Sequence, residues 1–257
     1  MIASPPDRIS PEHGPRLDDA ANFPGWSKAA ALLQEEISAR NLKDVADIGG
    51  GANPLIPTSF VRSTGLSYSV LDIAQSELDK APEEYEKICV DAGAPLEEFC
   101  DRVGKERFDL VFTHMFLEHV RDPVRVHRNI HAALKPGGLS IHFYPSPSNL
   151  PLLVNRVLPN WVTRPLLRIA QPKRDLDGHQ VKFPVFYAMC GGPSRSLRQK
   201  FEKLGFGTLR HTGYIGHWYY DRFSVTRNLE RAMRPLLLRV RIPLISYCVL
   251  VLQKQRS

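Results

Sequence analysis

The chain has 257 residues, of which 43% are hydrophobic and 24% charged, a composition typical of a globular protein with one sizeable core. Its longest apolar run, residues 243–252, is about half the ~20 residues that a membrane-spanning helix needs, and the N-terminus lacks the order of a secretory signal. Four scattered cysteines match neither a disulfide framework nor a zinc-binding pattern, so we expect no metal site and a reducing, cytoplasmic compartment.

The net charge of +7 is unevenly divided along the chain. Residues 1–145 carry −7 and residues 146–257 carry +14. Such an asymmetry indicates an anionic partner for the second half, although a solvated basic face explains it equally well.

The chain is expected to begin with a flexible, proline-rich lead over residues 1–25, followed by a single domain over residues 26–257. Apolar residues at helical spacing predict a helix over 26–40. A second helix is expected over 123–134, with Pro123 near its start and "KPGG" (135–138) as a glycine stop. Apolar runs predict strands over 44–49, 67–72, 87–91, 108–114 and 139–145. This alternation predicts an α/β fold built on a mostly parallel, doubly wound sheet.

The pattern changes after residue 145. Residues 146–193 are rich in proline, arginine and large apolar residues without a clean strand, and we expect them to form an insertion over the ligand edge of the sheet. A helix over 193–206, capped by Ser194 and ended by Gly205, returns to the sheet. Strands over 207–216 and 245–254, separated by a second basic, apolar stretch, bring the predicted sheet to seven strands.

Three glycines follow the first predicted strand in "DVADIGGGANPLIP" (44–57). Glycine loses more backbone entropy on folding than any other residue, so bare backbone must be needed there. In an open parallel sheet, ligands bind at the carboxyl ends of the strands, which is where this run lies. A dinucleotide-binding motif requires a third glycine where Pro54 stands, and no Gly-Lys-Ser/Thr of a phosphate loop follows.

A wider set of motifs accompanies the glycines. Asp47 precedes them, and Asp72 and Asp91 end the next two strands. "THMFLEHV" (113–120) follows the fourth strand and "LKPGG" (134–138) precedes the fifth. In this order and spacing, residues 44–145 resemble the class I S-adenosylmethionine-dependent methyltransferases. The resemblance implies a Rossmann-like methyltransferase fold, S-adenosylmethionine (SAM) as cofactor, and residues 26–145 as the cofactor half.

The resemblance also implies the roles of individual residues. Asp47, Gly49 and Gly51 would hold the methionine part of the cofactor. Asp72 would bind the hydroxyls of the ribose, and Ile73 would pack on the adenine.

Four further positions complete the expected cofactor site. Asp91 would meet the adenine amino group, with Ala92 beside the ring. Thr113 and His114 would line the cofactor near its sulfonium. A smaller or amide residue is common where this chain has His114.

A hydroxyl acceptor needs help in losing its proton, and histidine suits that role. His179, inside the predicted insertion, is the first candidate for a catalytic base and His119 the second, while a surface position remains the alternative for each. Glu118 is expected to cap the following helix or to pair with Arg121, and a direct catalytic role is the alternative.

The absence of two sequence motifs narrows the chemical class of the methyl acceptor. No Asn-Pro-Pro-Tyr motif follows the fourth strand and no cysteine lies in "PSPSN" (145–149), which argues against the common nucleobase-modifying enzymes. We therefore expect O-methylation of a sugar, a lipid-linked saccharide or another small metabolite, with an RNA methyltransferase and a non-catalytic binding module as alternatives.

Two basic and apolar segments, residues 150–174 and 231–244, suggest a surface partner. They suit an anionic membrane surface, which would place the protein at the inner face of a membrane. Nucleic acid binding would use the same charges with fewer aliphatic residues, and a plain core with arginine rims is the third interpretation. The aromatic run "GYIGHWYY" (213–220) is expected either to wall an acceptor pocket or to pack in the core.

Overall fold

A computed structural model describes residues 16–148, 184–216 and 244–256, together with the isolated positions 228, 232, 233, 235 and 239. The predicted insertion is described only at its two ends. His179, the segment 150–174 and most of 231–244 lie outside the described residues, as does the aromatic run beyond residue 216.

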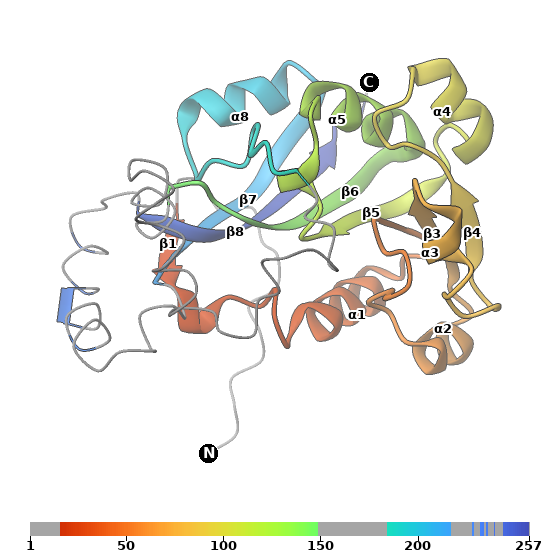
Figure 1. The fold of residues 1–257 in the computed structure, drawn as a ribbon, viewed down its shortest axis with the longest axis horizontal. Coiled ribbons are helices and arrows are strands. Elements are labelled where there is room, and N and C mark those ends of the chain that lie inside the picture. Colours follow the sequence, from red (N-terminus) through yellow and green to blue (C-terminus); the bar gives the residue numbers. More distant parts are fainter. Residues whose placement is uncertain are drawn as a thin grey trace, which may run out of the picture.

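An eight-stranded sheet with the order β1-β7-β8-β6-β5-β2-β3-β4 forms the centre of the structure (Figure 1). All neighbouring strands are parallel except β8, which runs antiparallel to β6 and β7. The strands are β1 (Arg16–Asp19), β2 (Asp44–Ile48), β3 (Ser67–Asp72), β4 (Glu86–Cys89), β5 (Phe108–His114), β6 (Leu134–Pro145), β7 (Phe206–Ile215) and β8 (Ile245–Lys254).

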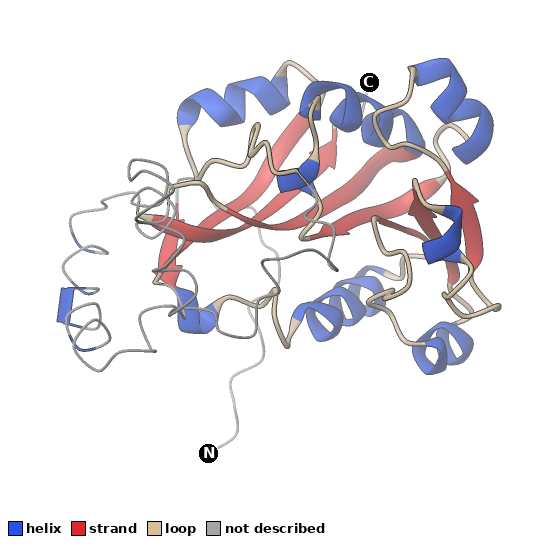
Figure 2. Cartoon of the chain, in the orientation of Figure 1, coloured by secondary structure: helices blue, strands red, loops and turns tan. Residues whose placement is uncertain are grey.

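Helices cover both faces of the sheet, as Figure 2 shows. The helices are α1 (Ala29–Arg40), α2 (Thr58–Thr64), α3 (Gln75–Leu78), α4 (Leu96–Val103), α5 (Pro123–Ala133) and α8 (Arg195–Glu202), with short 3₁₀ turns at η1 (Ala20–Asn22) and η2 (Leu117–His119). One buried cluster joins α4, α5 and α8 to the sheet, and a second joins α1, α2 and α3 to the opposite face. Because strand side chains alternate between faces, successive residues of the central strands enter different clusters.

The strand order reverses beside β2. The chain runs outward from β2 through β3 to β4, then returns to place β5 on the other side of β2. Ligands of open α/β sheets bind at such a reversal, outside the carboxyl ends of the strands. The glycine run therefore begins at the position that the fold favours for a ligand.

The predicted α/β class and doubly wound sheet are confirmed, and one strand was missed. Arg16–Asp19 forms the edge strand β1, which pairs in parallel with β7. The expected flexible lead is therefore wrong from residue 16 onward, because backbone pairing orders a polar segment that shows no strand pattern of its own.

The glycine stop predicted at residues 135–138 is also wrong. Helix α5 ends at Ala133, and its C-cap Leu134 is already extended. Leu134 pairs with Phe108 of β5, and a register shift follows before the next pairing. Strand pairing therefore takes over immediately after the helix, and "KPGG" belongs to β6. The cap at Ser194 is confirmed, since its side chain accepts a hydrogen bond from Leu197 N.

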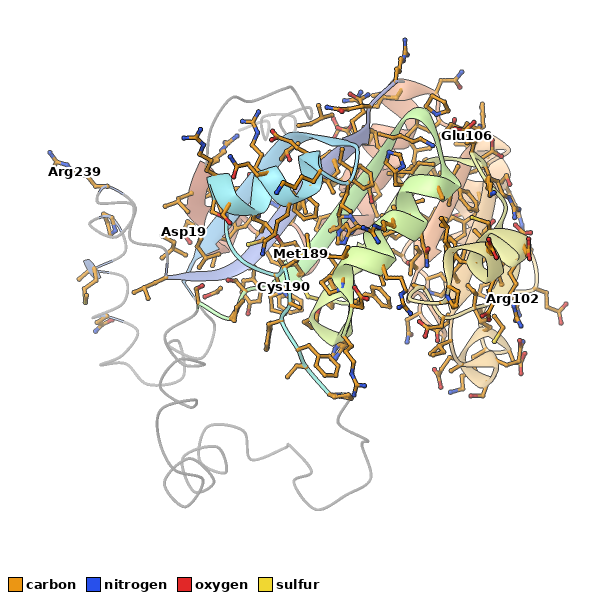
Figure 3. The ribbon with its side chains drawn as sticks, turned by 90° about the horizontal axis from the view of Figure 1, so that it is seen from above. Asp19, Arg102, Glu106, Met189, Cys190 and Arg239 are labelled. Atoms are coloured by element: carbon orange, nitrogen blue, oxygen red, sulfur yellow. The ribbon has the colours of Figure 1, made fainter. Side chains whose placement is uncertain are left out.

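Residues 184–193, named the returning segment, lead from the far end of the predicted insertion back to α8. Met189 and Cys190 mark this segment in Figure 3. Phe186 N and Tyr187 N both donate to the carbonyl of Glu118, at 2.7 and 3.2 Å. Tyr144 Oη donates to Gly191 O at 3.1 Å. The returning segment is thus fixed to η2 and to the end of β6, at the carboxyl edge of the sheet.

Within the described residues, no helix combines the length and the apolar character required to cross a bilayer.

Two buried histidines lie between α5 and the sheet. The His142 ring bonds Thr113 Oγ1 at 2.9 Å and Ser140 Oγ at 2.8 Å. His127 bonds Pro123 O through Nδ1, while its buried Nε2 has no hydrogen-bond partner in the described part of the chain. Burial lowers the pKa of His127 to about 4 and that of His142 well below its ordinary value.

We predict that His127 makes the fold sensitive to acid. A histidine with a folded pKa of about 4 contributes stability that is complete above its unfolded pKa near 6.5 and is lost as the pH falls toward 4. Between pH 7 and 4.5 the free energy of unfolding should fall by about 2 kcal/mol more in the native chain than in His127→Leu. Urea unfolding at both pH values measures this difference, and equal losses in the two proteins would contradict it.

Candidate active site

The glycine run makes two left-handed bends at the end of β2. Gly49 has φ +81° and Gly51 has φ +43°. A Cβ at Gly49 would lie 2.5 Å from the ring of Phe116, and a Cβ at Gly51 would lie 2.9 Å from Asp72 Oδ2. Both positions therefore require glycine, for backbone conformation and for close approach. The bends bring β2, the end of β3 and the turn after β5 together.

The buried carboxyl group of Asp47 packs against this loop. Its side chain is 1% exposed, and its Oδ2 accepts hydrogen bonds from Tyr68 Oη at 2.8 Å and Leu55 N at 3.3 Å. Gly50 crosses directly over the carboxyl group, since a Cβ there would lie 2.7 Å from Asp47 Cγ. Burial raises the pKa of Asp47 to about 7, the bonds from Tyr68 and Leu55 oppose that rise, and the charge of Asp72 adds to it.

Asp72 and Ile73 follow at the end of β3. Asp72 Oδ1 accepts a hydrogen bond from Ala74 N at 2.9 Å, which fixes the carboxyl group, while Oδ2 faces Gly51. Ile73 is 69% exposed, an unusual state for a large apolar side chain next to a sheet. An anion and an exposed apolar face therefore lie side by side at this edge.

The predicted residues after β4 form a neighbouring loop. Asp91 is exposed and its Oδ1 accepts from Gly93 N at 2.7 Å. Ala92 is buried, and Asn129 of α5 donates through Nδ2 to the carbonyls of Ala92 and Ala94, at 2.8 and 2.9 Å. The sequence interpretation missed Asn129, because a single amide within a helix gives no signal of the loop that it holds.

Thr113 and His114 lie differently from what was expected. The Thr113 side chain is fully buried and bonded to His142, on the face covered by α5. Strand alternation points this side chain into a helix-covered face, whereas the resemblance implied a position beside the cofactor. His114 turns to the opposite face and bonds Gly25 O through Nε2 at 2.5 Å, which ties the chain before α1 to the end of β5.

The turn η2 carries the second candidate base and an acid. His119 Nδ1 lies 3.0 Å from Pro184 O of the returning segment, and Nε2 lies 3.8 Å from Glu118 Oε1. Glu118 is 5% exposed, and burial raises its pKa to about 7. His179, the first candidate base, lies outside the described residues.

The described side chains include no group of three or more His, Cys, Asp or Glu that could hold a metal ion.

Aromatic residues surround the chain that enters α1. Phe23 stacks on Tyr247 with ring centroids 4.8 Å apart, and Trp26 meets the same ring edge-on at 5.3 Å. Tyr214 is buried against Phe23, so it packs in the core, whereas Trp26 is 55% exposed. Trp26 thus offers an aromatic face that the sequence interpretation did not single out.

Comparisons with known proteins identify a methyltransferase domain in this part of the chain. Residues 46–140 match a family model described as a methyltransferase domain. The ubiquinone biosynthesis O-methyltransferase of Coxiella burnetii (strain Dugway 5J108-111) is 27% identical over 111 residues, covering 41% of this chain and 44% of that protein. The match thus spans less than half the length of the curated relative.

Solved structures show the same fold. A SAM-dependent methyltransferase from Methanosarcina mazei has a TM-score of 0.52 at 17% identity, covering 83% of this chain and 93% of that chain. The [4+2]-cyclase SpnF has a TM-score of 0.51 at 16% identity, covering 96% of this chain and 87% of that chain. At such identities the likeness concerns the fold and not the reaction. Residues 46–140 therefore form a methyltransferase domain, and the chain has the fold of the SAM-dependent methyltransferases, with SAM as the implied cofactor.

Proposed function

We propose that the chain transfers a methyl group from SAM to a hydroxyl group of a small acceptor, such as a sugar, a lipid-linked saccharide or another small metabolite. The observation that carries this proposal is the fit of the β2–β3 edge to an adenosyl group. A fixed carboxylate, Asp72, lies beside a glycine bend that no Cβ could enter, and the exposed apolar Ile73 lies next to it.

These residues suit the parts of the cofactor. The Asp72 carboxylate would accept hydrogen bonds from the ribose hydroxyls, and Ile73 and Ala92 would flank the adenine, with Asp91 near its amino group. Gly49 and Gly51, supported by Asp47, would bring bare backbone to the methionine part. When bound, SAM supplies a methyl group already activated by the sulfonium charge, so the protein mainly positions the acceptor and excludes water.

The acceptor side is proposed to lie between the chain before α1 and the returning segment. Exposed Trp26 provides a flat apolar face of the kind on which sugars and aromatic rings pack. A hydroxyl acceptor agrees with the partial match to an O-methyltransferase. The basic segments 150–174 and 231–244 are proposed to contact an anionic membrane surface, where a lipid-linked acceptor would be reached.

The reaction is tested with SAM that carries an isotopically labelled methyl group. After incubation of the protein with a cell extract, mass spectrometry of the small-molecule, lipid and RNA fractions locates the label. We expect an O-methylated small molecule or lipid. Label confined to RNA would replace the proposed acceptor class, and absence of label from every fraction would contradict methyl transfer.

We predict that Asp72→Ala binds SAM roughly 10- to 100-fold more weakly, the worth of hydrogen bonds to a charged group. Asp79→Ala is the matched control, because it removes an exposed carboxylate from the same part of the chain, where Asp79 accepts only from Gln75 Nε2 among the described residues. Titration calorimetry measures both affinities. An unchanged affinity in Asp72→Ala would remove this carboxylate from the proposed site.

We predict that Tyr68→Phe also weakens SAM binding, by roughly tenfold at pH 7, because it removes the hydroxyl that fixes Asp47. That bond lowers the pKa of Asp47, so its loss favours the neutral carboxyl. The penalty should therefore be larger at pH 7 than at pH 8.5, where Asp47 is ionised in both proteins.

Tyr85→Phe is the control for this prediction. Tyr85 packs edge-on against Tyr68 with ring centroids 4.8 Å apart, but its hydroxyl donates to Ile56 O at 2.6 Å. Calorimetry at both pH values separates the two variants. Equal effects of the two substitutions would show that the hydroxyl of Tyr68 acts only on stability.

A further inference from the structure

Glu118 is a buried acid with an oxygen that nothing in the described chain satisfies. Its residue is 5% exposed, and Oε2 has no hydrogen-bond partner among the described residues. An unsatisfied buried polar group costs about 1–3 kcal/mol, and more when it is charged. An acid buried with this unfavourable free energy is a candidate for a role beyond packing.

The two structural roles expected for Glu118 are filled by other groups. Asp122 is the N-cap of α5, where its side chain accepts from Arg125 N at 3.0 Å. The guanidinium of Arg121 lies over the ring of Phe186, 5.4 Å from its centroid. Glu118 therefore neither caps the helix nor pairs with Arg121.

Glu118 lies where the proposed cofactor and acceptor regions meet. The turn that carries it is preceded by its N-cap Phe116, whose ring contacts Gly49 of the glycine run. Its own carbonyl accepts the N–H groups of Phe186 and Tyr187. The turn that carries Glu118 is thus held between the loop at β2 and the returning segment.

His119 connects this carboxyl group to solvent. Because Pro184 O can only accept, His119 Nδ1 is the donor of their 3.0 Å bond, and the lone pair of the neutral ring lies on Nε2. Nε2 faces Glu118 Oε1 at 3.8 Å, and the His119 side chain is 35% exposed whereas that of Glu118 is 7% exposed. A buried acid therefore adjoins a partly exposed base.

Resting on the proposed function, we propose that Glu118 accepts the proton of the acceptor hydroxyl and that His119 passes it to solvent. The acceptor oxygen forms its bond to the methyl carbon as its O–H bond breaks. The carbon–sulfur bond breaks with its electron pair remaining on sulfur. The proton moves to Glu118, then to His119 Nε2, and finally to water, so no oxidant or further reactant is needed.

The electrostatics of the pair support this role. Burial raises the pKa of Glu118 to about 7, so at neutral pH a large share is carboxylate with the basicity that a general base requires. Among the described residues, the titratable groups that face Glu118 are His119 on the same turn and Cys190 on the returning segment, and burial raises the pKa of the Cys190 thiol far above neutrality. Of these two groups only His119 is partly exposed, so it is the one that offers a route to solvent.

The first test needs no acceptor. Glutamate carboxyls are labelled with ¹³C, the Glu118 resonance is assigned by its loss in Glu118→Gln or Glu118→Asp, and its titration is followed by NMR. SAM and S-adenosylhomocysteine differ by one methyl group and one positive charge. If Glu118 faces the transferred methyl, its midpoint should be lower with SAM than with S-adenosylhomocysteine by roughly one pH unit. Equal midpoints would overturn the proposal.

The second test measures rates of methyl labelling in the extract described above. Glu118→Gln should lower the initial rate by about a hundredfold or more, the usual worth of a general base. Asp122→Asn is the matched control, since it removes a carboxylate four residues away while asparagine still caps α5. His119→Gln should slow the reaction and move its pH profile, because the carboxyl remains while its outlet is lost.

The outcomes separate the two proposals. A native chain that binds no SAM or labels nothing removes the proposed function, and the proton relay with it. A native chain that labels an acceptor, combined with full activity of Glu118→Gln, overturns the relay alone. If Glu118→Gln fails to fold, Glu118→Asp keeps a shortened carboxylate and should retain an intermediate rate.

Discussion

The burial of one carboxyl group at the end of the central strand shapes the whole ligand edge. Asp47 is held by Tyr68 and by Leu55 N, and Gly50 passes over it with no room for a Cβ. Since the loop must close over this group, the chain bends twice into the left-handed region, where glycine is required. Those bends in turn set the position of Asp72 and of the turn after β5. The glycine run, which in sequence is typical of a ligand-binding loop, is therefore also required to cover the buried carboxyl group of Asp47.

Acidic side chains have different surroundings at the amino ends and at the carboxyl ends of the parallel strands. At the amino edge, Lys135 pairs with Asp44 at 2.6 Å and with Asp109 at 2.9 Å, and backbone N–H groups together with Lys135 lower the pKa of Asp109 despite its partial burial. At the carboxyl edge, burial raises the pKa of both Asp47 and Glu118 to about 7. The ion-paired groups stabilise the structure, whereas the two buried acids can take up and release protons near neutral pH. The acids with raised pKa values thus lie at the carboxyl ends of the parallel strands, where ligands of such sheets bind.

The sequence predicts best where the chain is buried on both faces. The bounds of β3, β5 and β8 agree with their apolar runs residue by residue, because no competing pattern exists there. It fails where pairing overrides local preference: β1 is polar, and "KPGG" is drawn into β6. In the candidate site, strand ends locate Asp47, Asp72 and Asp91. The partners that decide their state, such as Tyr68 and Asn129, come from distant positions and carry no mark in a single sequence.

The returning segment links the covering of the site to the strength of its proposed base. Phe186 and Tyr187 donate to the carbonyl of Glu118, so the segment lies against this residue, and Cys190 of the same segment interacts electrostatically with its carboxyl group. Burial is the largest cause of the raised pKa of Glu118. A carboxyl that is covered is a stronger base than one in water, because desolvation disfavours its charged form. The same segment also orients His119, through the carbonyl of Pro184. The proposed proton acceptor and the proposed route to solvent are thus both fixed by contacts with one segment.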